Sequence, residues 1–313
     1  MEKFAPIVLF AYNRADHLAN TVRALSRCSE WAQTTVIVYS DGPRSDQDAH
    51  PVASVRRQLR GMNHPQFEII ARPRNFGLSR SIVSGVTEVC ARFGRVIVVE
   101  DDLVVSPLFL RYMNEALEAY AGRHDIFQVS GHMFDVSQFE NKEDAVLLPI
   151  ITTWGWATWQ RAWQFFEPSA VGWERLRWDR RERRRFNLDN AYNYYLMLER
   201  QMRGMGDSWG IRWYWSVFSR NGLTCYPPRS LVRNSGMDGS GTHGRGRLRN
   251  FGGASNHVSD IVPRLSANAS RCTDEEFSAV KRAIWRQNGG WRGRLVDSVK
   301  SLSRYLPWDR VVG

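Results

Sequence analysis

Apolar and polar positions alternate with a regular period over the first 130 residues of the chain. Apolar runs, rich in β-branched and aromatic residues, begin at Ile7, Val36, Phe67, Val96 and Ile126. The stretches between the runs carry apolar residues at helical spacing, and the last two predicted helices cover Leu78 to Phe93 and Leu108 to Tyr120. Strands that alternate with helices in this way predict stacked βαβ units, an α/β fold whose mostly parallel sheet is flanked by helices.

Two helix starts are predicted from single residues. Asp16 is expected to cap the first helix with its side chain, and Pro107 is expected to start the helix before Tyr112.

The fourth apolar run, in Arg95 to Pro107 (RVIVVEDDLVVSP), leads directly into three carboxylates, Glu100, Asp101 and Asp102. Adjacent carboxylates repel one another, so a divalent cation bound by oxygen is one expected partner. The alternative is a strand end whose acids cap the next helix or face water. In an extended strand, Glu100 and Asp102 would point one way and Asp101 the other.

Polar residues also follow the first three strands. Asn13 and Arg14 come after the first, Asp41 after the second, and the segment from Arg72 to Asn75 after the third. Ligands of such sheets bind beyond the carboxyl ends of the strands, so a shared binding crevice is expected there. Asp41 suits a ribose or a base, although an aspartate in a turn is most often only a turn residue.

The chain changes character after residue 133. Tryptophans crowd the next part of the sequence, at positions 154, 156, 159, 163, 173, 178, 209, 213 and 215. They are expected either to hold a second lobe together or to offer a platform for stacking a sugar ring.

A Gly-rich, basic loop follows at residues 234–253 and contains His243 and Arg245. Its Gly239-x-Gly241-x-x-Gly244 spacing is formally a dinucleotide fingerprint, but that motif needs a strand before it and a helix after it. We interpret the segment as a loop that closes over phosphates.

Three parts are therefore predicted: residues 1–133, the Trp-rich part 134–255, and a helical tail 256–313. In the tail, Thr273 and Glu276 form a capping box at a helix start. Residues 291–308 have an apolar face and a basic face, which fits either a membrane-surface helix or a helix docked on the protein itself.

The net charge of +11 and the pI near 9.9 favour a polyanionic partner: nucleic acid, an anionic membrane or a diphosphate. No apolar run is long enough to cross a bilayer, and the N-terminus does not fit a signal peptide. The four cysteines are scattered. A cytoplasmic protein is expected, with peripheral association with the inner membrane as a further hypothesis.

Asp207, in the sequence Gly206-Asp207-Ser208-Trp209, stands at a predicted helix start. Helix capping is the common role for an aspartate there. A carboxylate held among tryptophans would be partly desolvated, which makes it a stronger general base.

The order of VLFAYNR, YSDGP, RPRNFGLSRSI, VIVVEDDL, TTWGWATW, GDSWGIRW and DGSGTH resembles a bacterial family of GT-A-fold glycosyltransferases. That family is similar to N-acetylglucosaminyltransferase I, an inverting enzyme that uses UDP-N-acetylglucosamine and manganese. The resemblance covers residues 5–245 and implies the same fold and a UDP-sugar donor.

The resemblance also implies roles for single residues. Glu100, Asp101 and Asp102 match the acidic metal motif, with Asp102 as the direct ligand of Mn²⁺ or Mg²⁺. The residues that match nucleotide-binding segments are Asn13, Arg14, Asp41, Arg72, Asn75 and Arg80, joined by His243 and Arg245 of the closing loop. Asp207 matches the base, although the relatives have Asp-Asp-Trp where this chain has Asp-Ser-Trp.

The leading hypothesis is a metal-dependent, inverting glycosyltransferase that builds a bacterial surface glycan on a glycan or lipid-linked acceptor. A sugar-nucleotide nucleotidyltransferase is the alternative enzyme, but it gives the Trp-rich part and Asp207 no role. A nucleic-acid-binding protein is disfavoured because the basic residues are dispersed and no recognisable motif is present. A carbohydrate-binding protein without activity would explain the tryptophans but not the carboxylates.

Overall fold

The computed structural model describes residues 4–236 and 258–290 of the 313. His243 and Arg245, most of the Gly-rich loop and the amphipathic stretch 291–308 lie outside the described residues, so the predictions made for them stay predictions.

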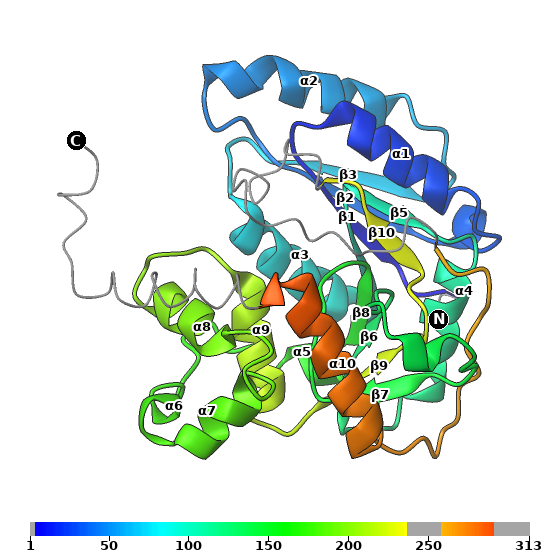
Figure 1. The fold of residues 1–313 in the computed structure, drawn as a ribbon. Helices are drawn as coiled ribbons and strands as arrows, with labels where there is room; N and C mark the ends of the chain where they lie inside the picture. The colour runs from blue at the N-terminus through cyan, green and yellow to red at the C-terminus, as the bar shows by residue number, and fades with distance from the viewer. Residues whose placement is uncertain (1–3, 237–257, 291–313) are drawn as a thin grey trace.

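An eight-stranded sheet forms the centre of the fold (Figure 1), in the order β3-β2-β1-β4-β8-β6-β9-β7. Its strands are β1 (Ile7–Ala11), β2 (Val36–Ser40), β3 (Phe67–Ala71), β4 (Arg95–Glu100), β6 (Ile126–Ser130), β7 (Val146–Leu148), β8 (Trp156–Trp159) and β9 (Leu223–Tyr226). Strands β1 to β4 pair in parallel, and so do β6 and β9, whereas β8 and β7 run antiparallel to their neighbours. The predicted α/β class, the mostly parallel sheet and all five predicted strands are confirmed.

The first four helices connect these strands. They are α1 (Ala15–Leu25), α2 (Asp46–Arg60), α3 (Leu78–Phe93) and α4 (Phe109–Ala119). Helices α1 and α2 lie on one side of β1 to β3, and α3 lies on the other (Figure 1). Both faces of the central strands are thus covered, and every residue of β1 and β2 is buried, as expected for continuous apolar strands in a parallel sheet.

Two predicted helix starts are wrong in detail. The N-cap of α1 is Arg14, which makes no side-chain capping bond, and Asp16 lies in the first turn, where its charge still favours the helix dipole. Helix α4 begins at Phe109, with Leu108 as its N-cap, so Pro107 precedes the helix instead of starting it.

The Trp-rich part adds short helices around α9 and a two-stranded sheet. These elements are α5 (Gln160–Trp163), α6 (Arg175–Trp178), α7 (Arg180–Phe186), α8 (Tyr194–Met202), α9 (Trp209–Phe218), and the antiparallel pair of β5 (Leu103–Val105) with β10 (Val232–Asn234). A second apolar core forms here, and Phe186, Tyr214 and Trp215 are buried in it. Because β8, β6, β9 and β7 extend the central sheet, the first two predicted parts share that sheet.

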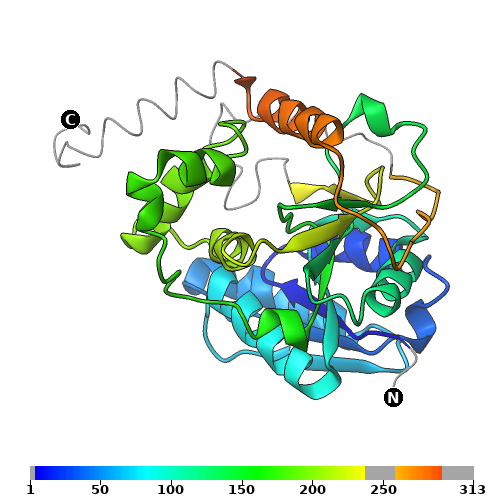
Figure 2. The ribbon, with the colours of Figure 1, turned by 90° about the horizontal axis from the view of Figure 1, so that it is seen from below.

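The last described helix, α10 (Asp274–Gln287), covers this second core (Figure 2). The predicted capping box is confirmed: Thr273 Oγ1 accepts from the backbone N–H of Glu276, and the Glu276 carboxylate accepts from that of Thr273. In the two described ranges, no helix combines the length and the apolar character that a bilayer crossing requires.

Candidate active site

The polar residues that follow β1, β2, β3 and β4 meet at one edge of the sheet. These four strands are parallel neighbours, so their carboxyl ends lie side by side. Asp41 and Arg72 continue the ladder directly, because the Asp41 N–H donates to the Ala11 carbonyl and the Arg72 N–H donates to the Ser40 carbonyl. The crevice expected from the sequence therefore has its predicted residues in one place.

Asp41 organises the chain that enters α3. Its buried carboxylate accepts backbone N–H bonds from Phe76 at 2.8 Å, from Gly77 at 3.0 Å and from its neighbour Gly42 at 3.0 Å. Gly77 has φ of 76°, a conformation that favours glycine. Asp41 thus fixes the backbone of the segment predicted to hold the nucleotide.

The side chain of Arg72 is directed into the protein. Its guanidinium donates to Ser81 Oγ, to the Ser81 carbonyl and to Ser84 Oγ, and it lies over the ring of Phe76 at 4.3 Å. Asn75 donates to the Gly42 carbonyl at 2.9 Å. Both residues lie at the predicted crevice, and their hydrogen bonds to the protein stabilise its shape.

Arg80 differs from Arg72 in being exposed. Its guanidinium lies on the Phe76 ring, 4.4 Å from the centroid. Phe76 therefore has a cation against it from each of two arginines, one buried and one exposed.

The side chains of the three acids at the end of β4 do not point to alternate sides, as an extended strand would have required. Strand β4 ends at Glu100 and the chain turns, so Asp101 and Asp102 both reach Arg14: its Nη2 lies 2.5 Å from Asp101 Oδ1 and 2.9 Å from Asp102 Oδ2. The second oxygen of Asp101 accepts from the Tyr12 N–H. Arg14 thus supplies a positive charge that compensates Asp101 and Asp102.

Glu100 carries the strongest electrostatic perturbation of the three. Burial, reinforced by the charges of Asp102 and Asp101, raises the pKa of Glu100 to about 8. Burial also raises the pKa of Asp101, although Arg14 acts in the opposite direction. Burial and like charge therefore both favour the protonated form of Glu100, and Arg14 opposes them.

Gly236 closes over this cluster. A Cβ at position 236 would overlap Asp102 Oδ2 and would lie 2.8 Å from Arg14 Nη1. Ser235 fixes the approach of the chain, because its N–H and its hydroxyl both donate to the Asp102 carbonyl at 2.8 Å. Gly236 is the last described residue before the segment predicted to close over the diphosphate, and it lies against the acids.

Asp102 fits the role of a metal ligand better than Asp101. Its side chain retains 14% exposure, whereas that of Asp101 retains 6% and is held by Arg14 and Tyr12. Mg²⁺ and similar ions are held by one or two carboxylates together with phosphate oxygens. Within residues 4–236 and 258–290, no three acidic, His or Cys side chains form a ready-made metal cage. Asp102 therefore suits an ion whose other ligands come from a bound diphosphate.

Asp207, from the Trp-rich part, lies next to the segment that Asp41 organises. Its Oδ2 lies 3.8 Å from the position that a Cβ of Gly77 would take. The prediction that its carboxylate is enclosed by tryptophans is wrong, because the side chain is 67% exposed. The capping alternative is wrong as well: the N-cap of α9 is Ser208, whose Oγ accepts from the Ile211 N–H.

Arg212, one helical turn into α9, is a site residue that the sequence did not indicate. Its Nη2 donates to Ser79 Oγ at 2.5 Å and lies 3.9 Å from Asp207 Oδ1. Burial lowers the pKa of Arg212, and Asp207 opposes that shift. Only its position four residues after Ser208, on the helix face toward α3, could have revealed it.

Most of the tryptophans have a structural role. Trp156 stacks on Trp209 at 5.3 Å, and Trp163 lies 5.0 Å from Trp213. These four, together with Trp159 and Trp215, are buried. Trp154 and Trp173 are half-buried, and Trp178 is 77% exposed. The structural role is confirmed for these six, but five of them belong to the core of the central sheet, and only Trp215 belongs to the second core.

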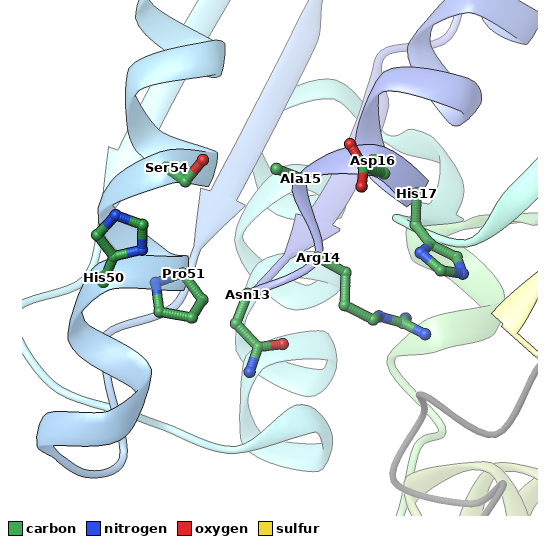
Figure 3. Close-up of a pocket in the computed structure, with 8 residues that line it drawn as sticks. All are labelled: Asn13, Arg14, Ala15, Asp16, His17, His50, Pro51 and Ser54. Carbon is green, nitrogen blue, oxygen red and sulfur yellow. The ribbon is translucent and has the colours of Figure 1, made fainter.

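A pocket of about 350 Å³ lies beside the carboxyl end of β1. It is lined by Asn13, Arg14, Ala15, Asp16, His17, His50, Pro51 and Ser54. In Figure 3, the residues of α2 face Asn13 across the pocket, while the Arg14 side chain extends away from α2. Asn13 also donates to Asp48 at 3.1 Å, so it joins α2 to the end of β1.

Similarities to solved structures are distant. GalNAc-T7 with UDP, GalNAc and Mn²⁺ shares 8% identity at a TM-score of 0.45, with 75% of this chain and 44% of that chain covered. The mannosyltransferase PcManGT from Pyrobaculum calidifontis, in complex with GDP-Man and Mn²⁺, shares 13% identity at a TM-score of 0.35, with 50% of this chain and 45% of that chain covered. TarS from S. aureus shares 15% identity at a TM-score of 0.26, with 40% of this chain and 21% of that chain covered. The chain thus spans less than half the length of each.

Family membership rests on sequence. No curated protein matches the chain significantly. Residues 7–195 match the profile described as glycosyl transferase family 2, and this range contains the residues at the ends of β1 to β4, including all three acids, but not Asp207. Because the profile covers more than half of the chain, the protein belongs to glycosyl transferase family 2, and its mixed α/β architecture is of the GT-A type.

Proposed function

We propose that the protein transfers a sugar from a nucleoside-diphosphate donor, with UDP favoured, to a glycan or lipid-linked glycan. The observation that supports this proposal most directly is that Asp207, from the Trp-rich part, lies beside Gly77, whose N–H is bound by Asp41 at the end of β2. Asp102 follows β4, two strands away from β2 in the same sheet. Membership of glycosyl transferase family 2 supports the same reaction class.

The proposed reaction is a single displacement with inversion. Asp207 accepts the proton of the acceptor hydroxyl while the new carbon–oxygen bond forms at the anomeric carbon. The bond from that carbon to the diphosphate breaks, and the nucleoside diphosphate leaves. A base and a leaving group on opposite faces of the sugar ring are the arrangement that inversion requires.

Asp102 is proposed to hold Mn²⁺ or Mg²⁺, which when bound neutralises charge on the diphosphate. Asp41, Arg72 and Asn75 keep the nucleotide segment in shape through the bonds described above. His243 and Arg245 are proposed to approach the diphosphate from the Gly-rich loop. Electrostatic stabilisation of the leaving group is expected to contribute more than proton removal.

The test is a thermal-shift screen against nucleotide sugars with and without Mn²⁺, followed by an assay of nucleoside diphosphate release. Stabilisation by one donor that depends on the metal, and release of that diphosphate with an acceptor, are expected. The anomeric configuration of the product, read by NMR, tests inversion. Release of pyrophosphate from a nucleoside triphosphate would instead support a nucleotidyltransferase.

An anionic membrane is the proposed partner surface. The stretch from Arg175 to Arg185 contains seven arginines and two carboxylates. It exposes Trp178, with the guanidinium of Arg177 5.0 Å from its ring, while Leu176 and Phe186 anchor the two short helices in the core. Exposed tryptophan among arginines suits the interface of an anionic bilayer, where a lipid-linked acceptor would be found. We call this stretch the Arg–Trp surface.

A further inference from the structure

The inference concerns Arg14, and it rests on the proposed function because it assumes that Asp102 meets a divalent cation. Arg14 is 21% exposed and lies at the start of α1, where its guanidinium is fixed from one side only. Nη2 donates to both Asp101 and Asp102. The two carboxylates therefore share a single nitrogen of a group that normally binds carboxylates through a two-nitrogen fork.

The other terminal nitrogen of Arg14 is unsatisfied. Among the described residues, Nη1 is buried and has no hydrogen-bond acceptor. It lies beside Gly236, where even a methyl group would be crowded. A buried guanidinium N–H without an acceptor is costly, so this arrangement leaves Arg14 ready to donate to an additional anion.

Asp102 Oδ2 is the atom for which two cations would compete. It accepts from Arg14 at 2.9 Å, and it belongs to the more accessible carboxylate of the two that contact Arg14. Asp101, by contrast, is held by Arg14 and by the Tyr12 N–H, so the Arg14–Asp101 pair can persist when Asp102 changes partner.

We propose that Arg14 is a displaceable counter-ion that competes with the divalent cation for Asp102 and so links metal binding to nucleotide binding. In the free protein, Arg14 neutralises Asp102 and weakens metal binding by occupying Oδ2 and by like-charge repulsion. A nucleoside diphosphate that meets the exposed part of the Arg14 side chain draws the guanidinium away from Asp102 and gives Nη1 the acceptor it lacks. Metal and diphosphate then bind with positive coupling, and the coupling is the same whichever binds first.

The experiment measures Mn²⁺ affinity by calorimetry and by the EPR signal of free Mn²⁺, with and without UDP or GDP. Without nucleotide, Arg14→Met is expected to bind Mn²⁺ at least about tenfold more tightly than wild type, because a cation about 3 Å from the ligand oxygen is removed. In Arg14→Met, the increase in Mn²⁺ affinity that nucleotide produces is expected to be smaller than in wild type. Arg23→Met, an exposed position on the same helix, is the control and should behave as wild type.

A second comparison keeps the test decisive if Arg14→Met folds poorly, since that change leaves Asp101 buried without its cation. The double variant Arg14→Met/Asp101→Asn removes the pair together, and it should bind Mn²⁺ more tightly than Asp101→Asn alone. Equal or weaker Mn²⁺ binding in both comparisons would overturn the role of Arg14. Failure of wild type and every variant to bind Mn²⁺, even with nucleotide, would instead contradict the proposed function.

Discussion

The guanidinium of Arg212 lies 3.9 Å from the carboxylate of Asp207. The two partners differ in environment, because the Arg212 side chain is 16% exposed and that of Asp207 is 67% exposed. Arg212 is also tied to α3 by its bond to Ser79, so it connects the proposed base to the helix that begins at the nucleotide segment. Asp207 therefore faces a half-buried cation while its oxygens stay open to an acceptor.

Asp207→Asn is expected to lower the rate of transfer by about 10²- to 10⁴-fold, the range typical of a lost general base. Its thermal midpoint and its affinity for nucleotide should stay close to wild type, because the side chain is exposed. Ser208→Ala is the matched control: loss of the cap should cost about 0.5–1 kcal/mol of stability and leave transfer largely intact. Near-normal transfer by Asp207→Asn would remove Asp207 from the mechanism.

Asp102 and Asp101 are expected to respond differently to replacement by alanine. Asp102→Ala should fold normally and lose the metal-dependent stabilisation by nucleotide, because Asp102 is the accessible carboxylate of the pair. Asp101→Ala should lose about 3–5 kcal/mol of stability, because it removes a buried partner of Arg14 and of the Tyr12 N–H. Urea denaturation and thermal shifts with Mn²⁺ and nucleotide measure both effects. The same phenotype in the two variants would argue against separate roles.

Five of the six strands up to residue 130 could be predicted, because each of the five is a short, continuous apolar run followed by polar residues. Strand β8 could not be predicted, because the aromatic residues of TTWGWATW fit a strand and a sugar platform equally well. The insertion of β8 between β4 and β6 is a long-range pairing that local pattern does not encode.

In the candidate site, too, some features follow from the sequence pattern and others depend on long-range packing. Topology alone places Arg14, Asp41 and the acids together, since parallel strands end at one edge. The exposure of Asp207 was mispredicted because burial depends on how α9 packs: Trp209 and Trp213 turn inward, and the residue before Ser208 remains outside. Arg212 was missed because nothing in a helical arginine indicates a partner such as Ser79, 133 positions away.

The Arg–Trp surface predicts binding to anionic vesicles. Full-length protein should sediment with phosphatidylglycerol vesicles and not with phosphatidylcholine vesicles, with each exposed arginine contributing about 1 kcal/mol near the surface. Arg180→Glu/Arg181→Glu should weaken this binding strongly, and Trp178→Ala should weaken it several-fold.

Phe165→Ala is the matched control for the vesicle experiment, because Phe165 is 40% exposed and lies outside the Arg–Trp surface. Unchanged vesicle binding in the Trp178 and arginine variants would show that another part of the chain contacts the membrane. Tight binding of oligonucleotides lost in the same variants would identify nucleic acid as the partner of this surface.

The burial of His132 leads to a prediction of how the free energy of unfolding depends on pH. His132 is buried against Trp154 and Phe134, with Nδ1 3.2 Å from Ser230 Oγ, and burial lowers its pKa to about 3. The unfolded chain, in which a histidine has a pKa of about 6.5, therefore takes up a proton first as the pH falls. The contribution of His132 to stability is constant above about pH 6.5 and declines below it by about 1.4 kcal/mol per pH unit, which amounts to about 2 kcal/mol at pH 5.

The measurement compares urea unfolding at pH 7.5 and pH 5 in wild type, in His132→Gln and in the exposed control His124→Gln. The difference between the two pH values should be smaller by about 2 kcal/mol in His132→Gln and unchanged in His124→Gln, whatever the absolute stability of each variant. Because the carboxylates that titrate in this range are common to all three proteins, their contributions cancel in the comparison. An identical pH dependence in wild type and His132→Gln would mean that His132 takes up its proton in the folded protein, and hence that water reaches the ring between Trp154 and Phe134.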